Sequence, residues 1–187
     1  MTTLSYSEKR SENIKWLFVF VAAKRDLNIA KKYIEKILAS KDGVEREALT
    51  ITLHVVYGRI FGKNYGLPKL KIECLSCHLT QAELDLHYSI IYHRDTIFAH
   101  SDLSKNKIQV SLKEGKLEAY PSYSTTLIDN HHETASTLFD KLIKCSDEKI
   151  NELLEILYGQ NNNLRPTDSS YVLLGCSDKT IWEEIRK

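Results

Sequence analysis

The stretch from Leu79 to Asp102 constrains the fold more than any other part of the chain. Apolar or histidine side chains recur there every three or four residues, which predicts one buried stripe of an amphipathic helix. The helix is expected to begin at Thr80, because Thr80 and Glu83 have the spacing of a capping box. The members of the predicted stripe are Leu79, Ala82, Leu86, Ile90, His93, Ile97 and His100.

Arg94 and His100 are the candidates for chemistry on this helix. A guanidinium suits phosphate oxygens, and an imidazole gives or takes a proton near neutral pH. On an ideal helix these two side chains point about 120° apart and lie roughly 9 Å apart along the axis. They meet only if the arginine bends, if the helix deforms near Ala99, or if a second copy of the chain brings its own pair. The spacing is also compatible with a structural alternative, in which His100 lies at the edge of the core and Arg94 is in solvent.

The remaining helices are expected at residues 44–61, 127–144 and 147–158, the last capped by Ser146. Residues 7–23 and 26–40 form either two helices, with Asp26 as the second N-cap, or one helix bent near Arg25. Alternating residues around 107–121 predict a β-hairpin that lies against the helices. Gly58 inside a helix costs roughly 1 kcal/mol against alanine, so something is expected to approach the backbone closely there.

Composition limits the classes of partner. The 187-residue chain carries a net charge of only +1, so any RNA binding has to be local and salt-sensitive. The most apolar run, residues 16–23, is too short to cross a bilayer, and no signal-peptide layout precedes it. A cytoplasmic protein with no membrane partner and four reduced cysteines is therefore expected.

One cysteine pattern offers an alternative. Cys74, Cys77 and His78 match the C-x-x-C-H of haem attachment, but that chemistry needs an oxidising compartment. No second C-x-x-C completes a zinc site. We therefore predict no metal and no cofactor.

The Arg94-Asp95 pair, followed by Ala99-His100-Ser101-Asp102 and preceded by His87, resembles the signature of the HEPN superfamily. Upstream, Tyr57-Gly58-Arg59-x-Phe61 is similar to its abortive-infection-type branch. The likeness covers roughly residues 10–160.

The resemblance implies an up-and-down helical bundle over residues 1–160, with the hairpin inserted after the motif helix and outside the family pattern. Residues 161–187 are expected to form a linker and a short C-terminal docking helix. The bundle would form a homodimer through the motif helix, so that two motifs share one cleft.

The implied function is a metal-independent endoribonuclease of defence or toxin type, with RNA as substrate and an antitoxin or regulatory protein as a further partner. His100 would act as general acid or base, Arg94 would hold the phosphate, and Asp95 would orient one of them. The candidates for substrate contact are Arg59, Tyr57, Ser101, Asp102 and His93. Arg59 as a solvated surface residue is equally compatible with the sequence. The alternative is a non-catalytic helical dimer that binds a protein or nucleotide.

Overall fold

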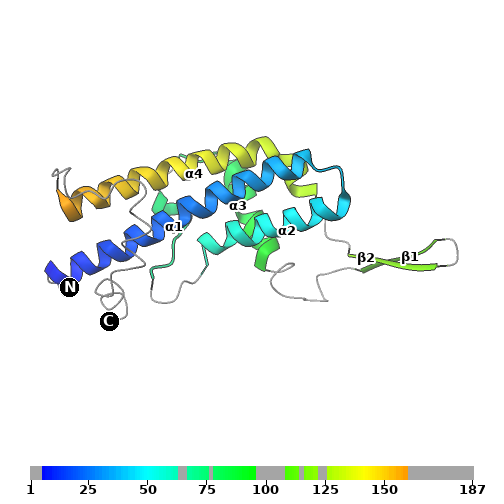
Figure 1. Cartoon of the computed structure of the whole chain (residues 1–187), viewed down its shortest axis with the longest axis horizontal. Helices are drawn as coiled ribbons and strands as arrows, with labels where there is room; N and C mark the ends of the chain where they lie inside the picture. Colours follow the sequence, from blue (N-terminus) through cyan, green and yellow to red (C-terminus); the bar gives the residue numbers. More distant parts are fainter. Residues whose placement is uncertain are drawn as a thin grey trace. The chain divides into compact units, whose positions relative to one another are not determined.

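The computed structural model of the chain is mainly helical, as predicted, and describes residues 6–62, 67–75, 78–95, 108–113, 116–121 and 126–159. Four α-helices contain most of these residues (Figure 1). In chain order the elements are α1 (Tyr6–Ala39), α2 (Gly43–Ile60), the short 3-10 helix η1 (Ile72–Leu75), α3 (Gln81–His93), β1 (Ile108–Lys113), β2 (Lys116–Pro121) and α4 (Thr126–Tyr158).

Helix α1 runs through Asp26 without a break, so the chain forms one helix where the sequence left one or two open. Asp26 is not an N-cap. Its buried carboxylate instead accepts a hydrogen bond from Arg59 Nε on α2, at 2.9 Å. An aspartate inside a helix is tolerated here because a cation from a neighbouring helix compensates its charge.

Helix α4 joins the two C-terminal helices that the sequence predicted, so the cap assigned to Ser146 is wrong. The Ser146 hydroxyl donates to the carbonyl of Leu142, one turn earlier in the same helix, at 2.8 Å. The irregularity of α4 lies instead at His131, whose φ of −129° and ψ of 23° mark a kink.

Strands β1 and β2 pair antiparallel, with Ile108 opposite Pro121 and Leu112 opposite Leu117. This pairing does not test whether a hairpin lies against the helices, which stays a prediction. Residues 114–115 of the predicted hairpin and the predicted tail at 161–187 fall outside the described residues.

The chain divides into two compact units. The first takes Met1–Arg25, Ile60–Cys77 and Leu142–Lys187, and its buried side chains include Phe20, Leu75 and Leu154. The second takes Asp26–Arg59 and His78–Lys141, and thus contains α2, α3 and parts of α1 and α4. The candidate site residues that the structure describes belong to the second unit: Tyr57, Arg59, His93, Arg94 and Asp95.

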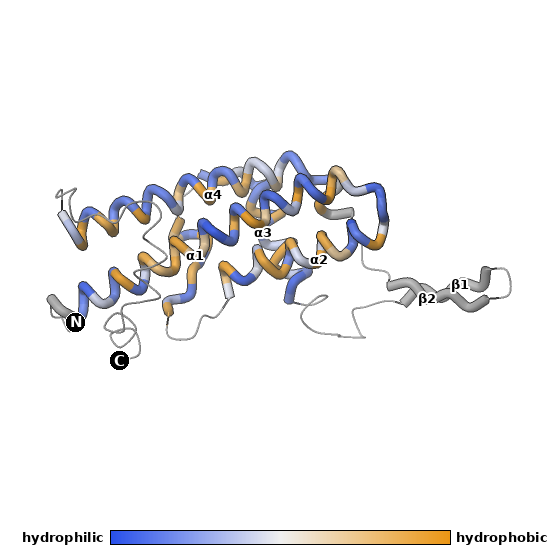
Figure 2. Tube along the Cα trace, in the orientation of Figure 1, coloured by the Kyte–Doolittle hydropathy of each residue, from blue (hydrophilic) through white to orange (hydrophobic). Residues whose placement is uncertain are grey.

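The second unit is a helical bundle with a shared apolar core. Each helix alternates apolar and polar stretches along its length, which matches one buried face per helix (Figure 2). The buried apolar side chains of this unit come from all four α-helices: Leu27, Ala30, Ile34, Ile37, Leu53, Val56, Tyr57, Leu86, Ile90, Ile128, Ala135, Leu138 and Phe139.

The start of α3 confirms the capping box. The Thr80 hydroxyl accepts from the Glu83 N–H at 3.3 Å, and the Glu83 carboxylate accepts from the Thr80 N–H at 2.7 Å. The buried stripe of α3 differs from the prediction, since Ala82 is exposed and Glu83 and His87 are buried.

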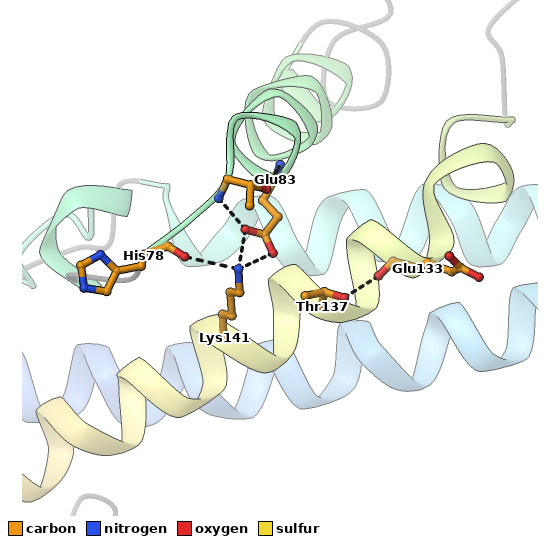
Figure 3. A network of polar contacts seen from close by, with 6 residues as sticks. His78, Glu83, Glu133, Thr137 and Lys141 are labelled. Atoms are coloured by element: carbon orange, nitrogen blue, oxygen red, sulfur yellow. Dashed lines mark hydrogen bonds and ion pairs between the residues drawn. The ribbon is translucent and has the colours of Figure 1, made fainter.

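Lys141 of α4 explains how a carboxylate can be buried at this position. Its Nζ lies 2.8 Å from both oxygens of Glu83 and also donates to the His78 carbonyl at 3.3 Å (Figure 3). Burial alone would raise the pKa of Glu83, but hydrogen bonds from Lys141 and Thr80 outweigh it and leave this pKa below its usual 4.5.

None of the described helices is both long and apolar enough to traverse a lipid bilayer.

Replacing Glu83 by glutamine should destabilise the protein by roughly 2 kcal/mol at pH 7, because the Lys141 ammonium loses its charged partner. Glutamine still suits a capping box, so the change isolates the charge. The folded-state pKa of Glu83 is lowered, so its contribution is complete above pH 4.5 and lost as the pH falls through the folded-state pKa. Urea unfolding of both proteins between pH 7 and pH 3 measures this.

Glu133→Gln is the matched control, because Glu133 is an exposed carboxylate on α4 in the same unit. It should leave the free energy of unfolding within about 0.5 kcal/mol of wild type. A gap between wild type and Glu83→Gln that stays constant down to pH 3 would contradict the lowered pKa.

Candidate functional site

The contact between α2 and α3 is built on Gly58. A Cβ placed at this residue would lie 2.6 Å from Arg94 Nε and 2.8 Å from Arg94 Cγ, so no larger residue fits while the arginine stays in place. The Arg94 Nη2 donates to the Gly58 carbonyl at 3.1 Å. The expected close approach to Gly58 is therefore confirmed, and the group that approaches is the candidate phosphate-binding arginine.

Arg94 caps the C-terminal end of α3, where its own N–H donates to the carbonyls of Ile90 and Ile91. Asp95 Oδ1 lies 2.8 Å from Arg94 Nε, but this nitrogen makes no hydrogen bond, so the contact is an ion pair off the N–H direction. The side chain of Arg94 is 23% exposed and that of Asp95 is 52% exposed. The guanidinium is thus held by α2 on one side and reaches solvent on the other.

His54 of α2 and His93 of α3 form a second contact between the same helices. Their ring centroids are 5.7 Å apart, and His54 Nδ1 donates to the Thr50 carbonyl at 2.7 Å. Burial lowers the pKa of His54 to about 4, the Thr50 hydrogen bond opposes this, and the charge of His93 adds to it. His54 is therefore neutral at pH 7.

His93 differs from His54 in exposure. It is half-buried, and this burial lowers its pKa below 6.5 without enclosing the ring. The Tyr92 ring lies beside it, with centroids 6.0 Å apart. His93 is thus mainly neutral at pH 7, with part of its surface open to solvent.

Tyr57 lies in the core of the second unit. Its hydroxyl is 2.8 Å from His87 Nδ1 on α3, and its ring stacks on Phe139 of α4 with centroids 5.0 Å apart. Tyr57 is fully buried and His87 is 4% exposed. Burial raises the pKa of Tyr57 well above 10, so the phenol stays protonated. Tyr57 therefore contributes to the packing of α2 against α3.

Arg59 points to a different helix. Its Nε pairs with Asp26 of α1 while the side chain stays 53% exposed. The two predicted substrate contacts on α2 therefore lie in different places. Tyr57 is in the core, and Arg59 is at the surface. His93, Arg94 and Asp95 are brought together at the end of α3. His100, Ser101 and Asp102 lie outside the described residues, so their roles stay predictions.

Within the part of the chain that the structure describes, no three His, Cys, Asp or Glu side chains cluster in a way that could hold a metal ion. Cys74 is a free, half-buried thiol, whereas Cys145 is disulfide-bonded. The expectation of four reduced cysteines is therefore wrong for Cys145. The cytoplasmic location stays a prediction.

Comparison with known proteins adds no relative: no family model, curated protein or solved structure matches this chain. The resemblance to the HEPN superfamily rests on the quoted sequence motifs and also stays a prediction.

The sequence motifs did not single out His54 as a neighbour of the site. His54 and Gly58 stand one helical turn apart on α2, and they face His93 and Arg94, which follow each other on α3. The spacing of four residues between His54 and Gly58 could have indicated that His54 lies near the site. Residues four apart on a helix share one face, so the face that requires a glycine also carries His54.

Gly58→Ala should displace Arg94 with little loss of stability. The added methyl group collides with the arginine, so the side chain must leave its place. Alanine is better than glycine inside a helix by roughly 1 kcal/mol, which offsets part of the lost packing. We expect urea unfolding to shift by less than about 1 kcal/mol, while any activity that depends on Arg94 falls.

Gly43→Ala is the matched control, because a Cβ at Gly43 meets nothing within 4 Å. In an Arg94→Ala background, Gly58→Ala should stabilise the protein by roughly 1 kcal/mol, since the collision is gone. An equal gain with and without Arg94 would disprove the collision.

Tyr57→Phe should destabilise the protein by about 1–3 kcal/mol, because a buried nitrogen of His87 loses its partner. Tyr88→Phe removes a hydroxyl from an exposed tyrosine of α3 and serves as the control for thermal unfolding. If Tyr57 acts only through packing, the KM for RNA should stay unchanged in Tyr57→Phe. A raised KM with unchanged stability would instead indicate direct contact with the substrate.

Proposed function

We propose that this chain is a metal-independent endoribonuclease of the HEPN type, with a role in defence or as a toxin. In the proposed reaction a ribose 2′-hydroxyl attacks the adjacent phosphate. Arg94 holds the non-bridging oxygens as their charge grows, and His100 transfers a proton.

The observation that carries the proposal is the setting of Arg94. Its guanidinium is fixed against the Gly58 carbonyl and beside Asp95, yet the side chain keeps 23% of its surface exposed. A fixed donor group that meets its phosphate without reorganising is the arrangement that stabilises developing charge most strongly. A glycine retained inside α2 at a local cost in helix stability further supports a need for the arginine at this place.

The remaining site residues have supporting roles in the proposal. Asp95 orients Arg94 through its ion pair, and Ser101 and Asp102 contact the RNA beyond His100. Arg59 offers a second cation, with Asp26 fixing its inner nitrogen. His93 lies next to Arg94, and Tyr57 contributes through the packing of α2 against α3.

The finer architecture belongs to the same proposal. It is an up-and-down bundle with the hairpin inserted after the motif helix, acting in the cytoplasm as a homodimer through that helix. Tyr88 and Tyr92 support the dimer, because both are more than half exposed and stand one turn apart on α3. An antitoxin or regulatory protein is a further partner in this proposal.

The alternative function is a non-catalytic helical dimer that binds a protein or nucleotide. The contact of Arg94 with Gly58 favours it, because this contact gives the arginine a packing role within the bundle. The exposed tyrosines of α3 serve this alternative equally well.

Cleavage of single-stranded RNA in EDTA tests the proposal. Wild type should cut, and His100→Ala should reduce the rate by about 100-fold or more, as expected for a lost acid or base. Arg94→Lys keeps the positive charge but loses the planar donor geometry, and should also cut slowly. Arg10→Lys, at an exposed position of α1, is the matched control and should cut like wild type.

Circular dichroism of each variant separates lost chemistry from lost folding. An inactive wild type under these conditions, across a broad RNA pool, would rule out the ribonuclease. If Arg94→Lys and His100→Ala change only the oligomeric state, measured by analytical ultracentrifugation, the binding module is favoured instead.

A further inference from the structure

The end of α3 carries an imidazole next in sequence to the proposed phosphate-binding guanidinium, and both side chains contact α2. His54 and Gly58, one turn apart on α2, contact His93 and Arg94, which are consecutive on α3. The two α3 side chains are therefore held against one row of the same helix. His93 keeps part of its surface in solvent, as Arg94 does.

Cleavage of RNA by its own 2′-hydroxyl needs two proton transfers. The attacking hydroxyl loses a proton on one side of the phosphorus, and the leaving 5′-oxygen gains one on the opposite side. His100 can serve only one of these positions in a given step. Arg94 stays cationic, and the Asp95 carboxylate is already paired with it.

We infer that His93 is the general base of the proposed reaction, an inference that rests on the proposed function. A ring nitrogen of His93 takes the proton of the 2′-hydroxyl while the 2′-oxygen forms its bond to phosphorus. The bond from phosphorus to the 5′-oxygen breaks, and His100 gives that oxygen a proton. The products are a 2′,3′-cyclic phosphate and a free 5′-hydroxyl, with no change of oxidation state.

The surroundings of His93 suit a base. Burial lowers its pKa below 6.5, so the ring is mainly neutral at pH 7 and can accept a proton. The titratable groups that contact it are His54 from α2 and Tyr92 from α3, and Arg94 and Asp95 follow it along α3.

His54 is a positioning residue in this arrangement. Its ring is 1% exposed and is fixed by the Thr50 carbonyl. It therefore presents a rigid, uncharged surface against which the His93 ring lies. A charged His54 would compete with protonation of His93, and burial prevents this at neutral pH.

The test measures kcat and KM for a labelled single-stranded RNA between pH 5 and pH 9 in EDTA. His93→Gln should lower kcat by about 100-fold or more, leave KM within roughly threefold, and remove the acidic limb of the pH profile. His78→Gln removes an exposed imidazole of the same unit and should leave kcat, KM and the acidic limb as in wild type.

The outcomes separate this inference from the proposed function. If wild type cuts RNA and His93→Gln keeps both its kcat and the acidic limb, His93 is not the base, although the ribonuclease stands. If wild type does not cleave RNA, both the proposed ribonuclease function and the assignment of His93 as its base are wrong.

A measurement on wild type covers the case in which His93→Gln does not fold. The ring proton signal of His93 is followed by NMR against pH, with and without uridine 2′-monophosphate. A phosphate beside the ring should raise the pKa of His93. An unchanged titration in saturating nucleotide would overturn the assignment.

Discussion

The absence of a side chain at Gly58 is the constraint on which the arrangement of the second unit depends. It lets the Arg94 side chain lie directly on the backbone of α2, with Nη2 donating to the Gly58 carbonyl. Gly58 lies in the last turn of α2, where the carbonyl groups have no N–H partner within the helix itself. The guanidinium of Arg94 donates to this carbonyl, so the backbone of α2 helps to orient it.

Each buried polar group named here from the rest of the unit has a specific partner. Glu83 meets Lys141, the Tyr57 hydroxyl meets His87, and the Asp26 carboxylate meets Arg59. Such pairs add little net stability, because desolvation offsets most of their attraction. Their effect is on alternative packings. A bundle with its helices rotated or shifted against one another would bury the same groups without partners, at a cost of about 1–3 kcal/mol for each neutral group and more for a charged one.

The sequence predicted the features that depend on near neighbours. The helical character, the capping box of Thr80 and Glu83 and the close approach at Gly58 follow from local spacing and backbone chemistry. The predicted caps at Asp26 and Ser146 failed for one reason. Short polar residues also occur inside helices when their side chains have another hydrogen-bond partner. Asp26 has Arg59, and Ser146 has the Leu142 carbonyl.

Contacts between residues far apart in the sequence could not be predicted from local spacing. The sequence assigned Glu83 to the capping box, but its burial also depends on Lys141, 58 residues later. The pairing of His54 with His93 depends on how α2 crosses α3, which periodicity does not specify. His93, Arg94 and Asp95 are neighbours in the sequence itself, whereas the burial of Tyr57 depends on the packing of the helices.

The contact at Gly58 also limits how this sequence can drift. A point mutation that adds a side chain at residue 58 first meets the stem of Arg94, and one that shortens residue 94 leaves the Gly58 carbonyl with one contact fewer. A single substitution at residue 58 or 94 therefore gives poorer packing, whereas two compensating substitutions avoid this. Among distant homologues these two positions should therefore vary together.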